Sequence, residues 1–147
     1  MRVKLFFTVG RNPKLEKKVK GIEIIRLKCW VQFKKTQGWT DPYRALVDTG
    51  APISLIPFSL WDASEHKVLA DHSVSGVVPK PECSIPIKVG TLSCKLVDTE
   101  GHESKEMEIH AYFALNDDVP LILGFKDVLA RFPHFFDYPQ RDAYLEA

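Results

Sequence analysis

Residues 45–54 read Ala-Leu-Val-Asp-Thr-Gly-Ala-Pro-Ile-Ser, and the predicted fold depends on this stretch. Three apolar residues lead into an acidic residue, after which come Thr, Gly and a small residue. This order predicts a buried strand that ends in a tight turn. A carboxylate at the end of a buried strand is costly unless it has partners, and Gly50 lets the backbone pass close to a neighbour. We therefore expect Asp48 to be held in place rather than freely solvated.

A second apolar block, residues 119–124, reads Val-Pro-Leu-Ile-Leu-Gly. It predicts a short buried strand ending at a glycine. Together the two blocks resemble the retroviral-type (retropepsin-like) aspartic proteases. The resemblance covers residues 22–129 and implies a short helix after the glycine, within residues 121–129. Family members usually open this helix with Gly, then Arg, Met or Tyr, then Asp. This chain has Gly124-Phe125-Lys126-Asp127, with one extra residue.

The resemblance implies an all-β chain with the retropepsin-like acid protease fold. This fold is a closed β-barrel of short strands with a flap hairpin and one or two short helices. One domain is expected over residues 1–147, since a chain of this length buries a sizeable core. Residues 1–21 and 130–147 are expected to supply terminal loops and strands, among them 3–9 and 135–145, which hold a dimer together.

The resemblance also assigns roles to the residues of the turn. Asp48 is the catalytic carboxylate, and the Thr49 hydroxyl braces two paired turns. The Gly50 N–H steadies the carboxylate, and Ala51 completes the active-site turn. The second block, through Leu123 and Gly124, supports the turn from below.

Residues 74–89 are expected to form the flap hairpin, which follows the Asp turn in this family. Ile85, Ile87 and Val89 alternate with other residues there, as in a strand. The flap implies substrate contacts from Gly76, Val77 and Val78. The usual flap carries more glycines than this one.

Peptide hydrolysis needs a base that activates water and an acid that protonates the leaving nitrogen. Two neighbouring carboxylates that share one proton perform both tasks. This chain has one Asp-Thr-Gly turn, because the nearest similar stretch, residues 98–101, reads Asp-Thr-Glu-Gly in a polar region and is typical of a hairpin tip. We therefore expect the second carboxylate to come from Asp48 of a second copy, related by a two-fold axis.

Further elements are expected along the chain. Strands are predicted at 22–33, with a bend or bulge after Ile25, and at 43–47, 92–97 and 107–115. Ser59 is expected to cap a short helix that includes Trp61. Residues 11–20 are polar and basic, and Pro13 interrupts any regular pattern. This segment is read as a solvated loop or as a patch for an acidic partner.

Composition narrows the functional classes. The formal net charge of +1 argues against a nucleic-acid binder that relies on bulk charge, and no apolar run approaches the roughly 18 residues of a membrane span. Cys29, Cys83 and Cys94 are odd in number and far apart, which favours free thiols and a cytoplasmic location. The Cys and His residues lack metal-ligand spacing, so no metal is expected, and the resemblance implies no cofactor.

The sequence thus predicts a homodimeric aspartic endopeptidase that acts on polypeptides. An alternative is a catalytically inactive module of the same fold, kept for peptide binding or dimerisation. A third interpretation is a structural β-domain of a larger assembly. Cleavage that depends on Asp48 separates the enzyme from the other two.

Overall fold

The computed structural model describes residues 1–75 and 84–147. Strands dominate these residues, so the all-β prediction is confirmed. The predicted flap residues Gly76, Val77 and Val78 lie outside the described part of the chain, as does Cys83.

Two sheets contain all the named strands of the described residues. The larger sheet has the strand order β2-β3-β4-β9-β5-β8-β7-β6, and the smaller has the order β1-β11-β10. The strands are β1 Arg2–Lys4, β2 Phe6–Gly10, β3 Ile24–Phe33, β4 Tyr43–Val47, β5 Ser54–Ile56, β6 His66–Ser75, β7 Ser84–Val97, β8 Met107–Ala114, β9 Ile122–Leu123, β10 His134–Asp137 and β11 Asp142–Glu146. The helices are α1 Pro13–Glu16, α2 Phe58–Asp62 and the 3₁₀ turn η2 Leu129–Arg131.

The larger sheet closes on itself. β3 pairs with β4 over residues 28–31 and also with β7 over residues 30–33, so β3, β4, β9, β5, β8 and β7 form a ring. Inward residues of these strands are fully buried, and Phe33, Phe113 and Ile56 are among the largest. The strands therefore form a closed ring, as predicted.

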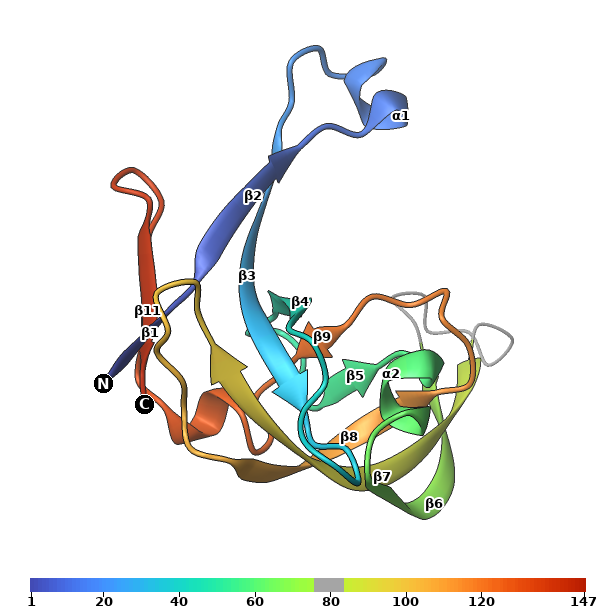
Figure 1. Cartoon of the computed structure of the whole chain (residues 1–147). Coiled ribbons are helices and arrows are strands. Elements are labelled where there is room, and N and C mark those ends of the chain that lie inside the picture. Colours follow the sequence, from blue (N-terminus) through green and yellow to red (C-terminus); the bar gives the residue numbers. More distant parts are fainter. Residues whose placement is uncertain (76–83) are drawn as a thin grey trace.

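The termini form a small sheet that packs on the same core. β11 lies between β1 and β10, and Val3 and Leu145 belong to the main hydrophobic cluster. Figure 1 shows the two ends of the chain side by side, and Met1 and Ala147 exchange backbone hydrogen bonds there. Residues 135–145, where terminal strands are predicted, contain β10 and β11, which pair with each other in an antiparallel manner.

The single strand predicted at residues 3–9 is in fact two strands in different sheets. Leu5 separates β1 from β2, and its N–H donates to the Ala143 carbonyl at 2.9 Å. Leu5 is buried, so the apolar run of the sequence continues although the chain passes from one sheet to the other at this residue. Periodicity alone does not distinguish this arrangement from one strand.

The segment 11–20 contains a helical turn rather than only loop. The Asn12 side chain accepts hydrogen bonds from the N–H groups of Lys14 and Leu15, and Pro13 occupies the first helical position. Proline is compatible with that position, because its missing N–H has no partner there in any case. Figure 1 shows α1 at the far end of the β2–β3 ribbon, which rises from the closed sheet.

Of the bend or bulge expected after Ile25, the bulge is absent, since β2 and β3 pair without a register shift from Lys28 to Ile24. The register shift occurs instead in β6, between Val68 and Ala70. The loss of alternation at Ile25 arises because both faces of the ribbon leave the core there.

The short helix predicted around Trp61 is present as α2, but Ser59 does not cap it. The Ser59 N–H instead donates to the Asp117 carboxylate at 2.8 Å, so the capping group comes from a distant loop. After Gly124 the chain makes turns before the 3₁₀ turn η2, which begins only at Leu129.

The predicted hairpin of the flap is longer than expected. β6 and β7 pair in an antiparallel manner from His66↔Leu92 to Ser75↔Ser84, and β7 continues through the strand predicted at 92–97. β8 then pairs with β7, and the polar turn at residues 98–102 joins them as predicted.

Candidate functional site

The Asp48 turn is built where three short strands meet. β9 runs between β4, to which it is parallel, and β5, to which it is antiparallel. The Leu46 N–H donates to the Leu121 carbonyl at 2.8 Å, and the Asp48 N–H donates to the Leu123 carbonyl at 3.0 Å. The backbone ladder therefore holds the chain up to and including Asp48.

The Asp48 side chain is half-buried and points back at its own turn. Its Oδ1 accepts the Gly50 N–H at 2.8 Å, and the Ala51 N–H donates to the Asp48 carbonyl at 3.2 Å. Thr49 and Gly50 are exposed. The carboxylate is thus oriented by one backbone donor while the tip of the turn stays open to a partner or a substrate.

Gly124 permits close contact between the second apolar block and this turn. A Cβ at this position would lie 2.6 Å from the Ala51 carbonyl oxygen and 2.9 Å from the Ile53 carbonyl carbon. The Gly124 N–H donates to the buried Ser54 hydroxyl at 3.0 Å, and the Phe125 N–H donates to the Ala51 carbonyl at 2.9 Å. Residues 121–125, which include Leu123 and Gly124, therefore fix the path of the turn.

An apolar hollow of about 330 Å³ lies against one side of the turn. Val47 and Thr49 contribute from β4 and the turn, and Phe136 of β10, 56 % exposed, lines the same hollow. The lining is completed by Phe7, Ile25, Leu27 and Tyr138. A concave apolar surface next to Thr49 is the kind of surface that a second protein chain covers.

The turn also lines a larger, open hollow of about 700 Å³. Thr49, Gly50 and Ala51 line it from the turn, and Phe125 and Lys126 line it from the segment after Gly124. Asp48 itself does not line this hollow, but the three residues that follow it do, so an extended ligand has room next to the turn.

Asp127, the last residue of the Gly124-Phe125-Lys126-Asp127 stretch, braces the site, a role that the sequence did not predict for it. Its Oδ2 accepts the His110 N–H at 2.9 Å and lies 2.8 Å from His110 Nδ1. Burial acts to raise the pKa of Asp127, but the hydrogen bonds from His110 outweigh it and lower the pKa below its ordinary value. Asp127 has a positive φ of 63°, which Asp tolerates better than most residues. The hydrogen bonds between Asp127 and His110 fix the segment after Gly124 to β8.

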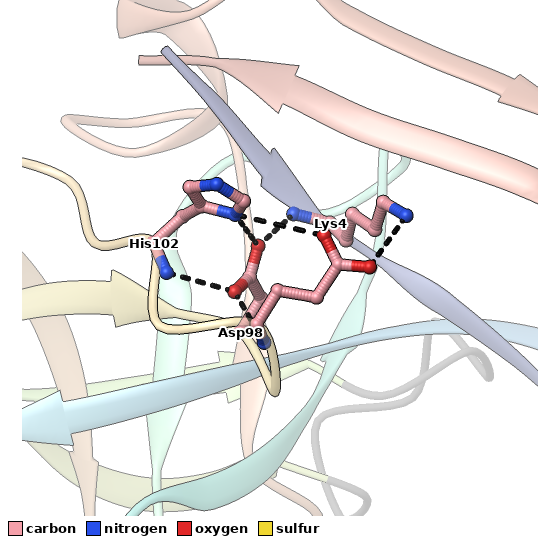
Figure 2. Close-up of polar contacts among 4 residues, drawn as sticks. Lys4, Asp98 and His102 are labelled. Carbon is pink, nitrogen blue, oxygen red and sulfur yellow. Dashed lines mark hydrogen bonds and ion pairs between the residues drawn. The ribbon is translucent and has the colours of Figure 1, made fainter.

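A second carboxylate that sequence reasoning compared with Asp48 is Asp98, and it serves a different purpose (Figure 2). Its Oδ2 accepts the Lys4 N–H at 3.0 Å and lies 2.9 Å from His102 Nδ1. Its Oδ1 accepts the N–H groups of Glu100 and His102, both at 2.9 Å. The side chain is only 2 % exposed, so Asp98 is a structural link between β1 and the β7–β8 turn.

Asp98, Glu100 and His102 also bring potential metal-ligand atoms within 4.8 Å of one another. Both Asp98 oxygens are, however, already used by four donors. The Glu100 carboxylate pairs with the Lys4 ammonium at 2.8 Å. We therefore interpret the cluster as a hydrogen-bonded junction rather than as a ligand set.

The thiols of Cys29 and Cys94 are free and buried, as expected for these two residues. Burial raises the pKa of Cys94 to about 12 and that of Cys29 still further. Neither thiol forms a nucleophilic thiolate at neutral pH.

A comparison with models of known protein families finds no match, and a comparison with curated proteins finds none either. In the part of the chain that the structure describes, no helix has the length and apolar character needed to cross a membrane. The functional interpretation therefore depends on the geometry of the chain itself.

Proposed function

We propose that two copies of this chain form an aspartic endopeptidase in which the two Asp48 carboxylates meet at a two-fold axis. The observation that carries the proposal is the construction of the Asp48 turn. Its carboxylate is half-buried and held by the Gly50 N–H, its backbone N–H is anchored to the Leu123 carbonyl, and the next three residues of the turn line an open hollow. Such rigid placement of an ionisable group next to open space is typical of a catalytic acid or base.

The proposal of a second copy rests on two other acidic side chains in turns of this chain, Asp98 and Asp127. Asp98 is enclosed by four donors, and Asp127 is bound to His110. Both hold their negative charge in structural contacts, so neither is free to share a proton with Asp48. The apolar hollow that includes Val47 and Thr49 supports a protein contact at the turn itself.

In the proposed mechanism the two Asp48 carboxylates share one proton. The ionised carboxylate takes a proton from water, which attacks the peptide carbonyl, and the protonated carboxyl polarises the carbonyl oxygen. The leaving nitrogen then receives a proton from the pair. The substrate lies extended beside the turn and pairs its backbone as an added strand. No cofactor takes part in this scheme.

The test is cleavage of a denatured protein substrate at mildly acidic pH, with product masses determined by mass spectrometry. We expect internal cleavage by the wild-type protein and none by Asp48→Asn. Binding of unfolded polypeptide without cleavage by the wild-type protein would favour the inactive peptide-binding module instead. Monomeric protein with full activity would overturn the shared site.

A further inference from the structure

Two hollows open along the β2–β3–β4 ribbon, and cationic side chains line both. The hollow nearer to α1, of about 550 Å³, is lined by Arg11, Lys14 and Arg26. The second, of about 430 Å³, is lined by Arg26, Lys28 and Arg44. Arg26 belongs to both, and no acidic residue lines either hollow. We call Lys14, Arg26, Lys28 and Arg44 the cationic track.

The charges of the cationic track have no internal partner. Among residues 1–75 and 84–147, no carboxylate lies within ion-pair distance of any of these four side chains. Of the cations in the two hollows only Arg11 is paired, with Glu16 at 2.8 Å. Lys14, Arg26 and Arg44 are exposed and Lys28 is half-buried. Like charges gathered on one surface repel one another, so an anionic ligand would relieve an existing repulsion.

The cationic track leads toward Asp48. Leu46 lines the second hollow with Arg44, two residues before it on β4. Because side chains alternate along a strand, Arg44, Leu46 and Asp48 share one side of the chain. The ladder bonds from the Leu46 and Asp48 N–H groups keep that alternation as far as the turn. At about 3.3 Å per residue, Arg44 lies about 13 Å from Asp48 along the strand.

We propose that the cationic track binds acidic side chains of an extended polypeptide substrate, on one side of the peptide bond that is cleaved at Asp48. This inference rests on the proposed function and gives it a substrate class. Arg26 and Lys28 are two residues apart on β3, so their side chains recur about 7 Å apart on one face. An extended peptide presents alternate side chains at the same spacing. The preferred substrate therefore carries Asp or Glu at alternate positions.

The charge distribution favours a short acidic peptide over a long polyanion. Residues 11–20 hold five of the 20 Lys and Arg residues and one of the 19 Asp and Glu residues, a net charge of +4. When Arg26, Lys28 and Arg44 of the cationic track are also set aside, the rest of the chain carries a net charge of −6 and repels a polyanion that extends beyond the track. Neither hollow has an aromatic lining residue for stacking on nucleic-acid bases.

The test measures binding separately from cleavage. Fluorescent peptides with Glu at alternate positions, or Gln at the same positions, are titrated with Asp48→Asn protein and followed by fluorescence anisotropy. We expect the Glu peptide to bind about tenfold more tightly at low salt, since ion pairs near the surface are individually weak but three of them add together. Added salt should reduce the difference, because it screens exposed charges.

Matched variants locate the effect. The triple change Arg26→Gln, Lys28→Gln and Arg44→Gln should remove the preference for the Glu peptide. The control removes three exposed lysines elsewhere that have no recorded ion pair, Lys35→Gln, Lys67→Gln and Lys105→Gln, and should keep the preference. Circular dichroism and thermal melting confirm that each variant is folded. The double variant Arg26→Lys with Arg44→Lys keeps both positive charges, so it should retain the preference for the Glu peptide.

Equal affinity for the Glu and Gln peptides would overturn the inference, and so would a preference that survives in the triple variant. Tighter binding of a single-stranded RNA of equal length than of the Glu peptide would overturn the choice of a polypeptide. Wild-type protein that prefers the Glu peptide but cleaves neither would support the cationic track and overturn the peptidase. Cleavage of both peptides at equal efficiency would support the peptidase and overturn the role of the cationic track.

Discussion

Asp48 combines an anchored backbone with a carboxylate that has one hydrogen-bond donor from its own turn. Asp48→Asn keeps a side-chain oxygen for the Gly50 N–H but cannot take a proton from water. We expect peptidase turnover to fall by roughly 10²- to 10⁴-fold, the usual contribution of a general acid–base group. The unfolding midpoint should stay unchanged and the dimer should become slightly tighter, because repulsion between two carboxylates is removed.

The measurement is a peptide-cleavage assay beside urea unfolding and sedimentation of the same samples. Asp41→Asn is the matched control, since Asp41 is exposed, has no recorded ion pair and lies in the loop before β4. Turnover by Asp48→Asn close to that of Asp41→Asn would contradict a catalytic role for Asp48.

Gly124 is the residue at which the second apolar block approaches the turn most closely. In Gly124→Ala the new methyl group would lie 2.6 Å from the Ala51 carbonyl oxygen and 2.9 Å from the Ile53 carbonyl carbon. Both are backbone atoms, which move only together with the turn. We expect a loss of about 1–3 kcal/mol in the free energy of unfolding, the usual effect of overpacking. Activity should fall as well, because Ala51 belongs to the proposed active-site turn.

Urea unfolding of Gly124→Ala measures this loss directly. Gly10→Ala is the control, because a Cβ at Gly10 has no atom within 4 Å and its φ is not in the left-handed region. An equal change in stability for both variants would mean that the close contact at Gly124 does not determine the effect.

At the scale of elements, Asp98 joins the terminal strand β1 to the β7–β8 turn through the Lys4 N–H (Figure 2). Hydrogen bonds from Lys4, His102 and Glu100 overcome the effect of burial and lower the pKa of Asp98 to about 2 from its ordinary value of 3.8. The folded-state pKa is depressed, so the link stabilises the fold above about pH 4. This stability is lost as the pH falls toward 2, and its size is about 2 kcal/mol.

We therefore expect Asp98→Asn to lower stability at pH 7 by about that amount, and to differ less and less from the wild-type protein between pH 4 and pH 2. Urea unfolding at several pH values checks this expectation. Asp62→Asn, at an exposed position in α2 without a recorded ion pair, is the control. A difference between Asp98→Asn and wild type that stays constant down to pH 2 would contradict the assigned pKa.

Sequence patterns predicted most strands because inward and outward residues alternate where one face is buried. β8 is the clearest case, with a regular buried–exposed pattern from Met107 to Ala111. The pattern fails where a segment leaves the core, as in the β2–β3 ribbon, and where a buried residue such as Leu5 joins two strands. Contacts between distant residues, such as Asp117 with Ser59 or Asp127 with His110, leave no local signal.

The site was predictable to a similar extent. The turn at residues 48–51 and the close approach of Gly124 follow from short local motifs, because small residues and glycine are needed there. The basic hollows were not predictable, since Arg26, Lys28 and Arg44 come from two strands whose pairing brings them together. Only the basic character of residues 11–20 indicated an acidic partner.

At the scale of the whole molecule, the proposed activity requires two chains, so the surface that holds them must include Thr49. Truncation of residues 142–147 is a poor probe of this contact, because β11 is the central strand of the terminal sheet and its Leu145 is buried. Loss of that strand damages the fold of each chain. Phe136 is a better position, since it is 56 % exposed and lines the apolar hollow beside Thr49.

Phe136→Asp should raise the dimer dissociation constant at least about tenfold, since it removes apolar contact area and places a charge in an apolar contact. Because a monomer carries half a site, specific activity of the wild-type protein should fall on dilution below that constant. In the variant the same fall should occur at a correspondingly higher protein concentration. At saturating concentration the variant should regain wild-type turnover, because Asp48 and its turn are intact.

Sedimentation beside a dilution series of the peptidase assay measures the dimer dissociation constant and the specific activity. Leu115→Asp, which replaces an exposed apolar residue outside the hollow, is the control. Specific activity that stays constant while the protein dissociates would refute the shared site and require a second acid within one chain.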